Sequence, residues 1–421
     1  MLAYIDRQVI TLVAAPIAKS LTLTDTQLGA VQGLAFAIFT VIATYPLAWL
    51  ADRYDRRVVL GLCVLLWSAG TAACGLAQNF MQLFVAAVII AAGEAGLVPI
   101  GVSIIPDLFS GRQRVIANSI NYFASYLGVS LALFLGGATI AALDAAHAGL
   151  SAELPQLESW RIAFLLLAAA GPFFLIPIAF MQLRRPVITT APGAPGAIAL
   201  VLPYVRTHYR TLSTVFVGLA LYVFAFGGFL SWLPVANARQ FGTTAAQNGF
   251  GMGIATGAGV VVGVTLGTLL MRRYQRRLGH AAALRIAWVG MSMATPVLIG
   301  FPFVTAAWQS YVLMGLLMTV GTMVGVLVPN ILQDIAPSGI RARVIALFSI
   351  ANALFGSLSP MAVGAVSDRI PGHGGLFTAL TIMAVPAWLI ATAITRIAEK
   401  PFVRTASWVI ATKQGGASAD G

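Results

Sequence analysis

The sequence predicts an all-α membrane protein in which twelve transmembrane helices form two six-helix bundles. Its 421 residues are 59% hydrophobic and only 9% charged, with a mean hydropathy of +0.89, whereas a soluble protein carries about 25% charged residues. A helix that crosses a bilayer needs roughly 20 apolar residues, and stretches of that length recur along the chain. We expect spans near 1–19, 28–51, 58–77, 81–106, 115–143, 160–183, 211–235, 245–271, 284–304, 306–335, 342–367 and 374–398.

A polar break divides these spans into six and six. Residues 184–210 hold several prolines and glycines, which are typical of a linker and not of a span. The expected organisation is a bundle over 1–183, a cytoplasmic linker over 184–210, a second bundle over 211–398 and a cytoplasmic tail over 399–421.

The two bundles repeat each other in sequence. Residues 53–57 (RYDRR) match residues 273–277 (RYQRR) at an offset of 220, and residues 114–117 match residues 343–346 (both RVIA) at an offset of 229. Parallel repeats of six spans place a substrate site between the halves, near the middle of the membrane. Gene duplication without transport is the alternative.

Basic residues are concentrated in one set of loops. Apart from Arg7, twenty of them lie in those loops and the tail, and only Lys19, Arg161, Arg239 and Arg369 lie in the alternate loops. Because loops rich in Lys and Arg stay cytoplasmic, we expect a multi-pass protein of the cell inner membrane with both termini in the cytoplasm. The net charge of +12 then reflects these loops, and no nucleic-acid partner is expected.

The first span is short. It has 18 residues before Lys19, which at 1.5 Å per residue make about 27 Å, barely the thickness of a bilayer. Either this helix stops inside the membrane, or the true start lies upstream. We expect helix 1 to be truncated.

Signatures of catalysis and metal binding are lacking in the sequence. It contains neither a phosphate-binding Gly-Lys-Ser/Thr loop nor a Gly-x-Ser-x-Gly motif, and its histidines lack metal-ligand spacing. Cys63 and Cys74 lie in one apolar segment and are interpreted as inert buried thiols. We therefore expect no enzyme, no cofactor and no metal. A membrane scaffold that does not transport is the remaining alternative from another class.

Several motifs together carry a family resemblance. They are residues 4–8 (YIDRQ), 24–29 (TDTQLG), 50–57 (LADRYDRR) and 93–96 (GEAG), the last followed by Pro99. The set resembles the Spinster-like branch of the major facilitator superfamily over nearly the whole chain, and most specifically over residues 1–120. The organic anion/cation symporter branch shares the Tyr-x-Asp-Arg start and the Glu-Ala pair of the fourth span.

The resemblance implies the major facilitator fold and a secondary active transporter that works by alternating access. Spinster-like proteins are associated with lysolipids and sphingoid phosphates, and commonly with proton coupling. We therefore expect a monomer in the lipid bilayer whose partners are protons and a small amphiphilic or anionic solute. A small organic-acid symporter or a drug exporter is the alternative. One departure is Ala87, which stands where the family usually has an Arg two helical turns before the span-4 Glu.

The loop between the second and third spans carries Asp52, Arg53, Arg56 and Arg57. In the superfamily this loop is a conformational latch. The resemblance implies that Asp52 meets a neighbouring helix N-terminus, where negative charge is favoured by about 0.3–1 kcal/mol. The three arginines are equally well explained as positive-inside residues, so Asp52 is the informative member.

Two carboxyl groups share one depth in the membrane. Glu94 is the only ionisable residue between Met81 and Asp107, and a carboxylate at membrane depth costs several kcal/mol unless it is paired, hydrated or protonated. Asp6 lies 13 residues before Lys19, and Glu94 lies 13 residues after Met81, which puts both about 20 Å below the same surface. We hypothesise that Glu94 is the main proton carrier and Asp6 the second.

Arg7 lies at this depth too, and adjacent helix positions point about 100° apart. Arg7 therefore either turns to the cavity and holds an anionic group of the substrate, or pairs with Glu94. An Asp6–Arg7–Glu94 network that merely offsets burial is the rival interpretation. Other polar residues in or near the spans either line the cavity and bind substrate or make interhelical contacts: Tyr4, Asn118, Tyr122 and Asn330.

Overall fold

The computed structural model describes residues 2–108, 111–150, 158–181, 197–337, 340–370, 372 and 374–417. Within these ranges the chain forms helices and short connections, and no β-strand. The first half comprises α1 (Leu2–Leu12), α2 (Ala14–Ser20), α3 (Asp25–Gly29), the π-helical segment η1 (Ala30–Leu34), α4 (Ala35–Arg53), α5 (Arg56–Leu76), α6 (Phe80–Leu108), α7 (Gly111–Leu150), α8 (Ser159–Ala170), the 3-10 helix η2 (Gly171–Phe174) and α9 (Leu175–Phe180).

The second half repeats this series. It comprises α10 (Ala197–Thr207), α11 (Tyr209–Phe241), α12 (Ala245–Leu278), α13 (Ala281–Gly300), the 3-10 helix η3 (Phe301–Phe303), α14 (Ala307–Gly325), α15 (Val328–Asp334), α16 (Arg341–Ser367) and α17 (Gly375–Ala417). Consecutive short helices join into single passes, so the chain makes six passes before α10 and six after it. Nine of the described stretches are long and apolar enough to cross a membrane, and a shorter apolar stretch covers Phe80–Gly96. The predicted all-α membrane fold is confirmed.

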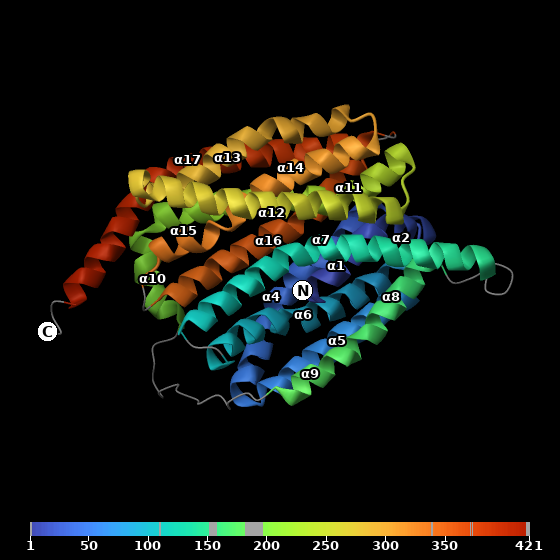
Figure 1. The fold of residues 1–421 in the computed structure, drawn as a ribbon, viewed down its shortest axis with the longest axis horizontal. Helices are drawn as coiled ribbons and strands as arrows, with labels where there is room; N and C mark the ends of the chain where they lie inside the picture. Colours follow the sequence, from blue (N-terminus) through green and yellow to red (C-terminus); the bar gives the residue numbers. More distant parts are fainter. Residues whose placement is uncertain are drawn as a thin grey trace.

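The two halves lie side by side. In Figure 1 the helices of the first half, coloured blue to green, form one group, and those of the second half, light green to red, form the other. The halves meet along two seams: α3, η1 and α4 pack on α16, and α7 packs on α12. We call the end of the bundle at which α9 ends and α11 begins the linker side, and the opposite end, at which α3 begins, the far side.

The first pass is broken at Val13, where the backbone has φ −96° and ψ 12°. Pro16 accounts for this break, because its ring clashes with the carbonyl group of Leu12, four residues earlier, and it has no N–H to donate. The hydrogen-bond ladder continues on each side, from Val13 N–H to Val9 O and from Ile17 N–H to Val13 O, both at 3.0 Å. The pass is therefore two helices stacked end to end.

The repeat is visible in how the second and eighth passes begin. Thr24 caps α3 by accepting the Gln27 N–H at 3.2 Å, and the Gln27 side chain accepts the Thr24 N–H at 3.1 Å. Thr244 and Gln247 form the same reciprocal cap on α12, at 3.2 and 3.0 Å. Each cap satisfies two backbone donors that a helix start leaves unpaired.

The last pass is longer than the predicted span 374–398, because α17 continues to Ala417. Its extension keeps a buried face that includes Phe402 and Val409. Thr405 hydrogen-bonds Thr211 of α11, with 2.8 Å between the hydroxyl oxygens. The Trp408 ring lies 6.1 Å from that of Tyr204 on α10, a helix within the predicted linker 184–210. Packing against α10 and α11 explains why the helix does not end at residue 398.

Candidate functional site

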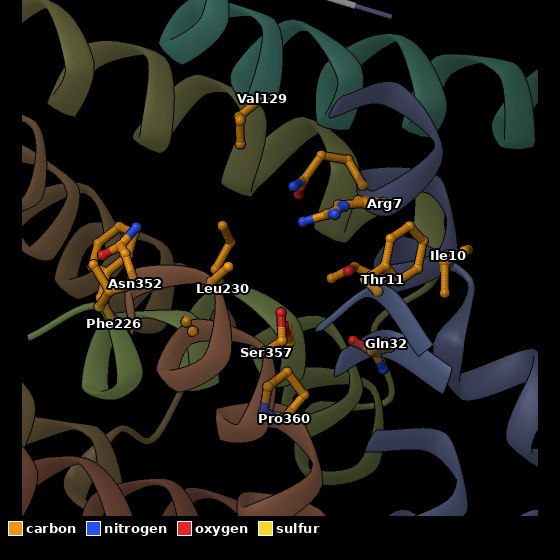
Figure 2. Close-up of a pocket in the computed structure, with 17 residues that line it drawn as sticks. Arg7, Ile10, Thr11, Gln32, Val129, Phe226, Leu230, Asn352, Ser357 and Pro360 are labelled. Carbon is orange, nitrogen blue, oxygen red and sulfur yellow. The ribbon is translucent and has the colours of Figure 1, made fainter. Parts of the chain in front are cut away.

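A cavity of about 350 Å³ lies between the two halves. Its walls come from α1, η1, α4 and α7 of the first half and from α11 and α16 of the second. Figure 2 shows Arg7 and Thr11 on one side of this space, Asn352 and Phe226 on the other, and Leu230 between them. The position between the halves agrees with the site that the internal repeat predicts.

Arg7 connects the cavity to Glu94 of α6. Its Nε donates to Glu94 Oε2 at 3.2 Å, and its guanidinium carbon lies 4.3 Å from the centre of the Phe36 ring. The Glu94 side chain is 6% exposed and that of Arg7 is 39% exposed. Arg7 therefore pairs with Glu94 and also lines the cavity, and its binding of an anionic substrate group stays a prediction.

Only one of the two carboxylate oxygens of Glu94 has a hydrogen-bond partner among the described residues. Its Oε2 accepts from Arg7, whereas its buried Oε1 has no hydrogen-bond partner among the described residues. The neighbouring glycine explains how α6 brings this carboxylate so deep: a Cβ on Gly93 would lie 2.5 Å from the Trp67 backbone nitrogen of α5. Glycine thus lets α6 pack directly on the α5 backbone.

Three amide side chains that the sequence did not single out line the same cavity. They are Gln8 of α1, Gln32 of η1 and Asn352 of α16. Buried amide atoms on each lack a hydrogen-bond partner among the described residues: Gln8 Oε1, both Oε1 and Nε2 of Gln32, and Asn352 Oδ1. The cavity wall therefore offers neutral hydrogen-bonding groups beside one cation.

The structure does not place several of the predicted site residues at the cavity. The side chains of Tyr4, Asp6, Asn118 and Tyr122 lie outside the described part of the structure. Asn330 is exposed on α15 and is not among the residues that line the cavity. Within the described residues, no group of three or more His, Cys, Asp or Glu is placed to hold a metal ion.

The predicted latch is described only in part, because the Asp52 side chain lies outside the described residues. Arg57 pairs with Asp55, with 2.6 Å between Nη2 and Oδ2, and donates from Nη1 to Met181 O at 3.3 Å. Asp55 also caps α5 by accepting the Arg57 N–H at 2.9 Å. These contacts stay within the first half, and the latch formed by Asp52, Arg53, Arg56 and Arg57 remains a prediction.

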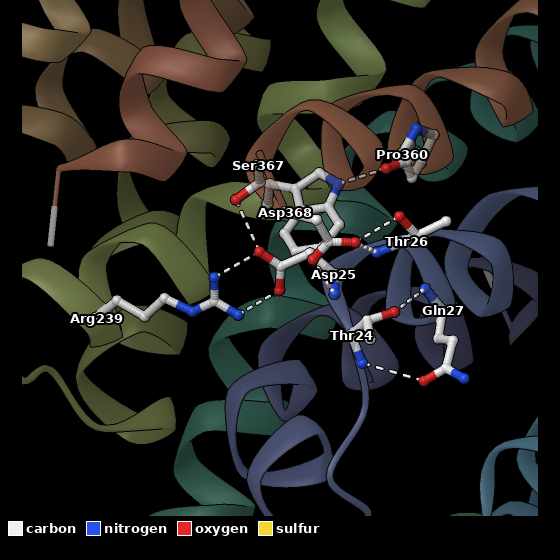
Figure 3. A network of polar contacts seen from close by, with 9 residues as sticks. Thr24, Asp25, Thr26, Gln27, Arg239, Pro360, Ser367 and Asp368 are labelled. Atoms are coloured by element: carbon white, nitrogen blue, oxygen red, sulfur yellow. Dashed lines mark hydrogen bonds and ion pairs between the residues drawn. The ribbon is translucent and has the colours of Figure 1, made fainter. Parts of the chain in front are cut away.

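A second polar cluster, at the far side, joins the two halves (Figure 3). We call it the far-side lock; its members are Asp25, Thr26, Arg239, Ser367 and Asp368. Both Asp25 carboxylate oxygens accept from Arg239, with 2.6 Å between Nη1 and Oδ2, and Ser367 Oγ donates to Oδ2 at 2.7 Å. Asp25 is 6% exposed. A bidentate pair between Arg and a carboxylate is among the strongest polar contacts a protein makes.

Asp368 caps the start of α3 from the opposite half. Its carboxylate accepts the N–H groups of Asp25 and Thr26, both at 2.9 Å, and the Thr26 hydroxyl at 2.5 Å. Partial burial acts to raise the pKa of Asp368, but these hydrogen bonds and the Arg239 charge outweigh it and hold the pKa below the ordinary 3.8. The sequence carried one signal for this lock, since Arg239 is one of the few basic residues on the far side.

Comparison with known proteins agrees with this architecture. The model of the Major Facilitator Superfamily matches residues 1–360. An MFS-type efflux pump of Mycolicibacterium smegmatis is 28% identical over 88% of this chain and 82% of its own length. The mouse sphingosine-1-phosphate transporter SPNS2 is 26% identical over 88% of this chain and 68% of its own length.

The fold has close neighbours among solved structures. A bacterial homologue of the human lysosomal transporter Spinster, in an inward-facing and unoccupied conformation, superposes with a TM-score of 0.75 at 22% identity, covering 97% of this chain and 95% of that one. Family model and fold thus agree, and the chain belongs to the Major Facilitator Superfamily of membrane transporters.

Proposed function

We propose that this transporter is proton-coupled and carries an amphiphilic or organic-anion solute by alternating access. The observation that supports the proposal best is the ion pair between buried Glu94 and Arg7, a residue that lines the cavity between the halves. A carboxylate and an arginine at this depth are costly, and ionisable groups inside a membrane domain mark substrate or proton pathways.

The pair links proton binding to anion binding. While Glu94 is ionised, it shares the positive charge of Arg7 through the Nε contact. When Glu94 takes a proton, that competition ends, and Arg7 is left to bind an anionic group of the solute in the cavity. Loss of the proton restores the pair and weakens the hold on the anion. We propose the same proton-carrying role for Asp6, the second predicted proton carrier, which directly precedes Arg7 on α1.

The proposed solute class is supported by the relatives and by the cavity wall. One relative is a sphingosine-1-phosphate transporter, whose named solute is amphiphilic, and another, over 41% of this chain, is a probable L-galactonate transporter of Escherichia coli. The wall combines Arg7 with apolar Phe36, Phe226 and Leu230. Drug export is the second candidate, favoured by the 28% identity to the mycobacterial efflux pump.

Transport tests the role of Glu94. A ligand-stabilisation screen of the purified protein, comparing lysophospholipids with sugar acids, selects the solute, and uptake of its labelled form is then measured in proteoliposomes. Glu94→Gln should abolish accumulation driven by an imposed pH gradient while leaving exchange or binding measurable. Glu158→Gln, which changes an exposed far-side carboxylate, is the matched control. Accumulation that survives in Glu94→Gln would show that the Arg7–Glu94 pair is structural.

Orientation requires its own test. We propose that the protein lies in the inner membrane with the linker side in the cytoplasm, because basic residues are concentrated there. Topology reporters fused within residues 144–158 should report the outside, and a reporter at the C-terminus should report the cytoplasm. A reporter outside the membrane at the C-terminus would overturn this orientation.

A further inference from the structure

The least expected feature of the cavity is the environment of Gln32. This residue lies in η1, the π-helical turn that interrupts the second pass. A π-turn inside an α-helix changes the direction of the side chains around it and is frequent at functional sites. Its amide is buried, neither Oε1 nor Nε2 has a hydrogen-bond partner among the described residues, and the side chain lines the cavity.

The backbone around Gln32 is held firmly by the opposite half. A Cβ on Gly29 would lie 2.4 Å from Pro360 O, and a Cβ on Gly33 would lie 2.0 Å from Ser357 O. Within the second half, Trp232 of α11 donates from Nε1 to the same Pro360 O at 2.8 Å, which fixes this part of α16. The glycines on either side of Gln32 therefore press η1 onto α16, and the Gln32 amide is presented to the cavity from a fixed backbone.

The amides of Gln8 on α1 and Asn352 on α16 line the same cavity. Gln8 is 5% exposed and its Oε1 has no partner among the described residues; the same is true of Asn352 Oδ1. Figure 2 places Gln32 and Asn352 on different sides of the cavity, with Ser357 between them. Leaving a buried polar atom unpaired is unfavourable, so the arrangement favours a ligand that pairs with these amides.

The charge of the cavity wall restricts the class of ligand further. Among the described residues that line the cavity, Arg7 is the only charged one, and it already shares its charge with Glu94. One cation suits a ligand with a single anionic group. Amides both donate and accept hydrogen bonds, which matches hydroxyl groups, since a hydroxyl does both as well.

We propose that Gln32, with Gln8 and Asn352, forms a hydrogen-bonding subsite for hydroxyl groups next to the single anionic group that Arg7 binds. This inference rests on the proposed function, because it takes the anion site at Arg7 as given and names the chemistry beside it. The same chemistry occurs in a free polyhydroxylated acid and in the glycerol head group of a lysolipid. Two matched pairs of probes distinguish these sources.

Binding to the purified full-length protein is measured by calorimetry and by thermal protection. The first pair is gluconate against hexanoate, two six-carbon acids that differ in their hydroxyl groups. The second is lysophosphatidylglycerol against lysophosphatidylethanol, two lysolipids with one negative charge, of which only the first carries free hydroxyl groups on its head-group alcohol. In at least one pair the hydroxylated member should bind at least about tenfold more tightly, because a site built to hydrogen-bond hydroxyls rejects analogues that lack them.

Variants assign that preference to residues. Gln32→Leu should reduce the preference to less than about threefold by weakening the hydroxylated probe alone, and Asn352→Leu should reduce it in part. Gln240→Leu removes a far-side amide that does not line the cavity and should leave the preference unchanged. Arg7→Gln should weaken both members of the pair equally, since it removes the anion site.

The outcomes separate the two proposals. Equal binding of both members of each pair to the wild-type protein, or a preference that survives in Gln32→Leu, would overturn the amide subsite while leaving anion binding at Arg7 intact. Binding of no probe at all, or binding that is indifferent to Arg7→Gln, would overturn the anion site and with it the subsite. Equal binding of both members of each pair to the wild-type protein overturns the amide subsite even where a variant fails to fold, and Asn352→Leu then still tests the assignment if Gln32→Leu does not fold.

Discussion

The seam formed by α3, η1 and α4 with α16 and the seam formed by α7 with α12 are related by the internal repeat, yet different contacts hold them. Both begin at matching threonine caps, and both bring a glycine against the opposite half. A Cβ on Gly29 would lie 2.4 Å from Pro360 O, and a Cβ on Gly249 would lie 2.5 Å from Gly137 Cα. Small residues of this kind let membrane helices approach closely.

Among the described residues, in contrast, an ion pair joins the halves at one seam only. Asp25 follows Thr24 and binds Arg239, whereas Ala245 follows Thr244 in the repeat. Among the described residues, the side-chain hydrogen bond that joins α7 to α12 runs from Ser130 Oγ to Gly253 O, at 2.5 Å. The comparison teaches that both repeats bring helices of the two halves into close approach, whereas among the described residues the far-side lock occurs at one seam.

The largest expected effect comes from breaking the lock. Arg239→Gln should cost about 1.5–3 kcal/mol in the state with a closed far side, because it leaves Asp25 buried without its cation. Spin labels at the exposed far-side positions Thr22 and Thr305 should then report a larger share of long distances. Arg369→Gln is the control, since that side chain donates to Ala365 O of its own helix at 2.5 Å.

A double variant sharpens this test. Adding Asp25→Asn to Arg239→Gln should change the distances by less than the sum of the single changes, because the two groups act as one pair. Strictly additive shifts would show that Asp25 and Arg239 do not hold the halves together.

Glycine substitutions should affect both seams alike. Gly249→Ala and Gly29→Ala should each lower the free energy of unfolding by about 1–3 kcal/mol, because the added methyl group meets backbone atoms that have little room to move. Thermal unfolding of the purified protein measures both. Gly61→Ala is the matched control, since its Cβ would meet only Leu175 Cδ2, at 3.7 Å. If only one of the two seam variants is destabilised, the shared role of close approach is wrong.

Ser130→Ala, at the seam between α7 and α12, should lower the free energy of unfolding by a smaller amount. Losing one hydrogen bond between neutral groups should cost about 0.5–1.5 kcal/mol. Thr139→Ala, which removes a hydroxyl bound at 2.9 Å to Leu135 O of its own helix, serves as control in the same unfolding measurement. A loss as large as that of Arg239→Gln would mean that this hydrogen bond, and not packing, holds the seam.

The smallest effect is expected from Asp368, which is exposed. Asp368→Asn should weaken the far-side contact by about 0.3–1 kcal/mol, the usual value of a charge at a helix start. Because the pKa of Asp368 is held below its ordinary 3.8, the carboxylate contributes at every pH above that value, and its contribution is lost only as the pH falls through the lowered pKa.

Measuring the far-side distances as a function of pH tests whether the pKa of Asp368 is lowered. Between pH 8 and pH 5, the far-side distances should respond equally in the wild-type protein and in Asp368→Asn, and the two should converge only below about pH 4. A difference between them that disappears between pH 7 and pH 5 would show that the Asp368 carboxyl has a raised pKa and does not cap α3 as an anion.

Much of the fold and part of the site were predictable from the sequence, because they depend on local periodicity and on depth. Apolar stretches of span length predicted the passes, and the 220-residue offset predicted an internal repeat, to which the matching caps of Thr24 and Thr244 correspond. Counting 1.5 Å per residue from the span ends predicted that Glu94 and the Asp6–Arg7 pair share a depth. The structure shows Arg7 paired with Glu94.

Contacts between distant residues were decided by the tertiary structure alone. Asp25 and Asp368 are separated by 343 residues, and no period in the chain says that their helices meet. Gln32 gave no signal either, because the π-turn that contains it changes which side of the helix its side chain occupies, and a pattern of 3.6 residues per turn does not register that change. Length and polarity act within one helix and can be read along the chain, whereas the cavity and the lock exist only where the two bundles pack together.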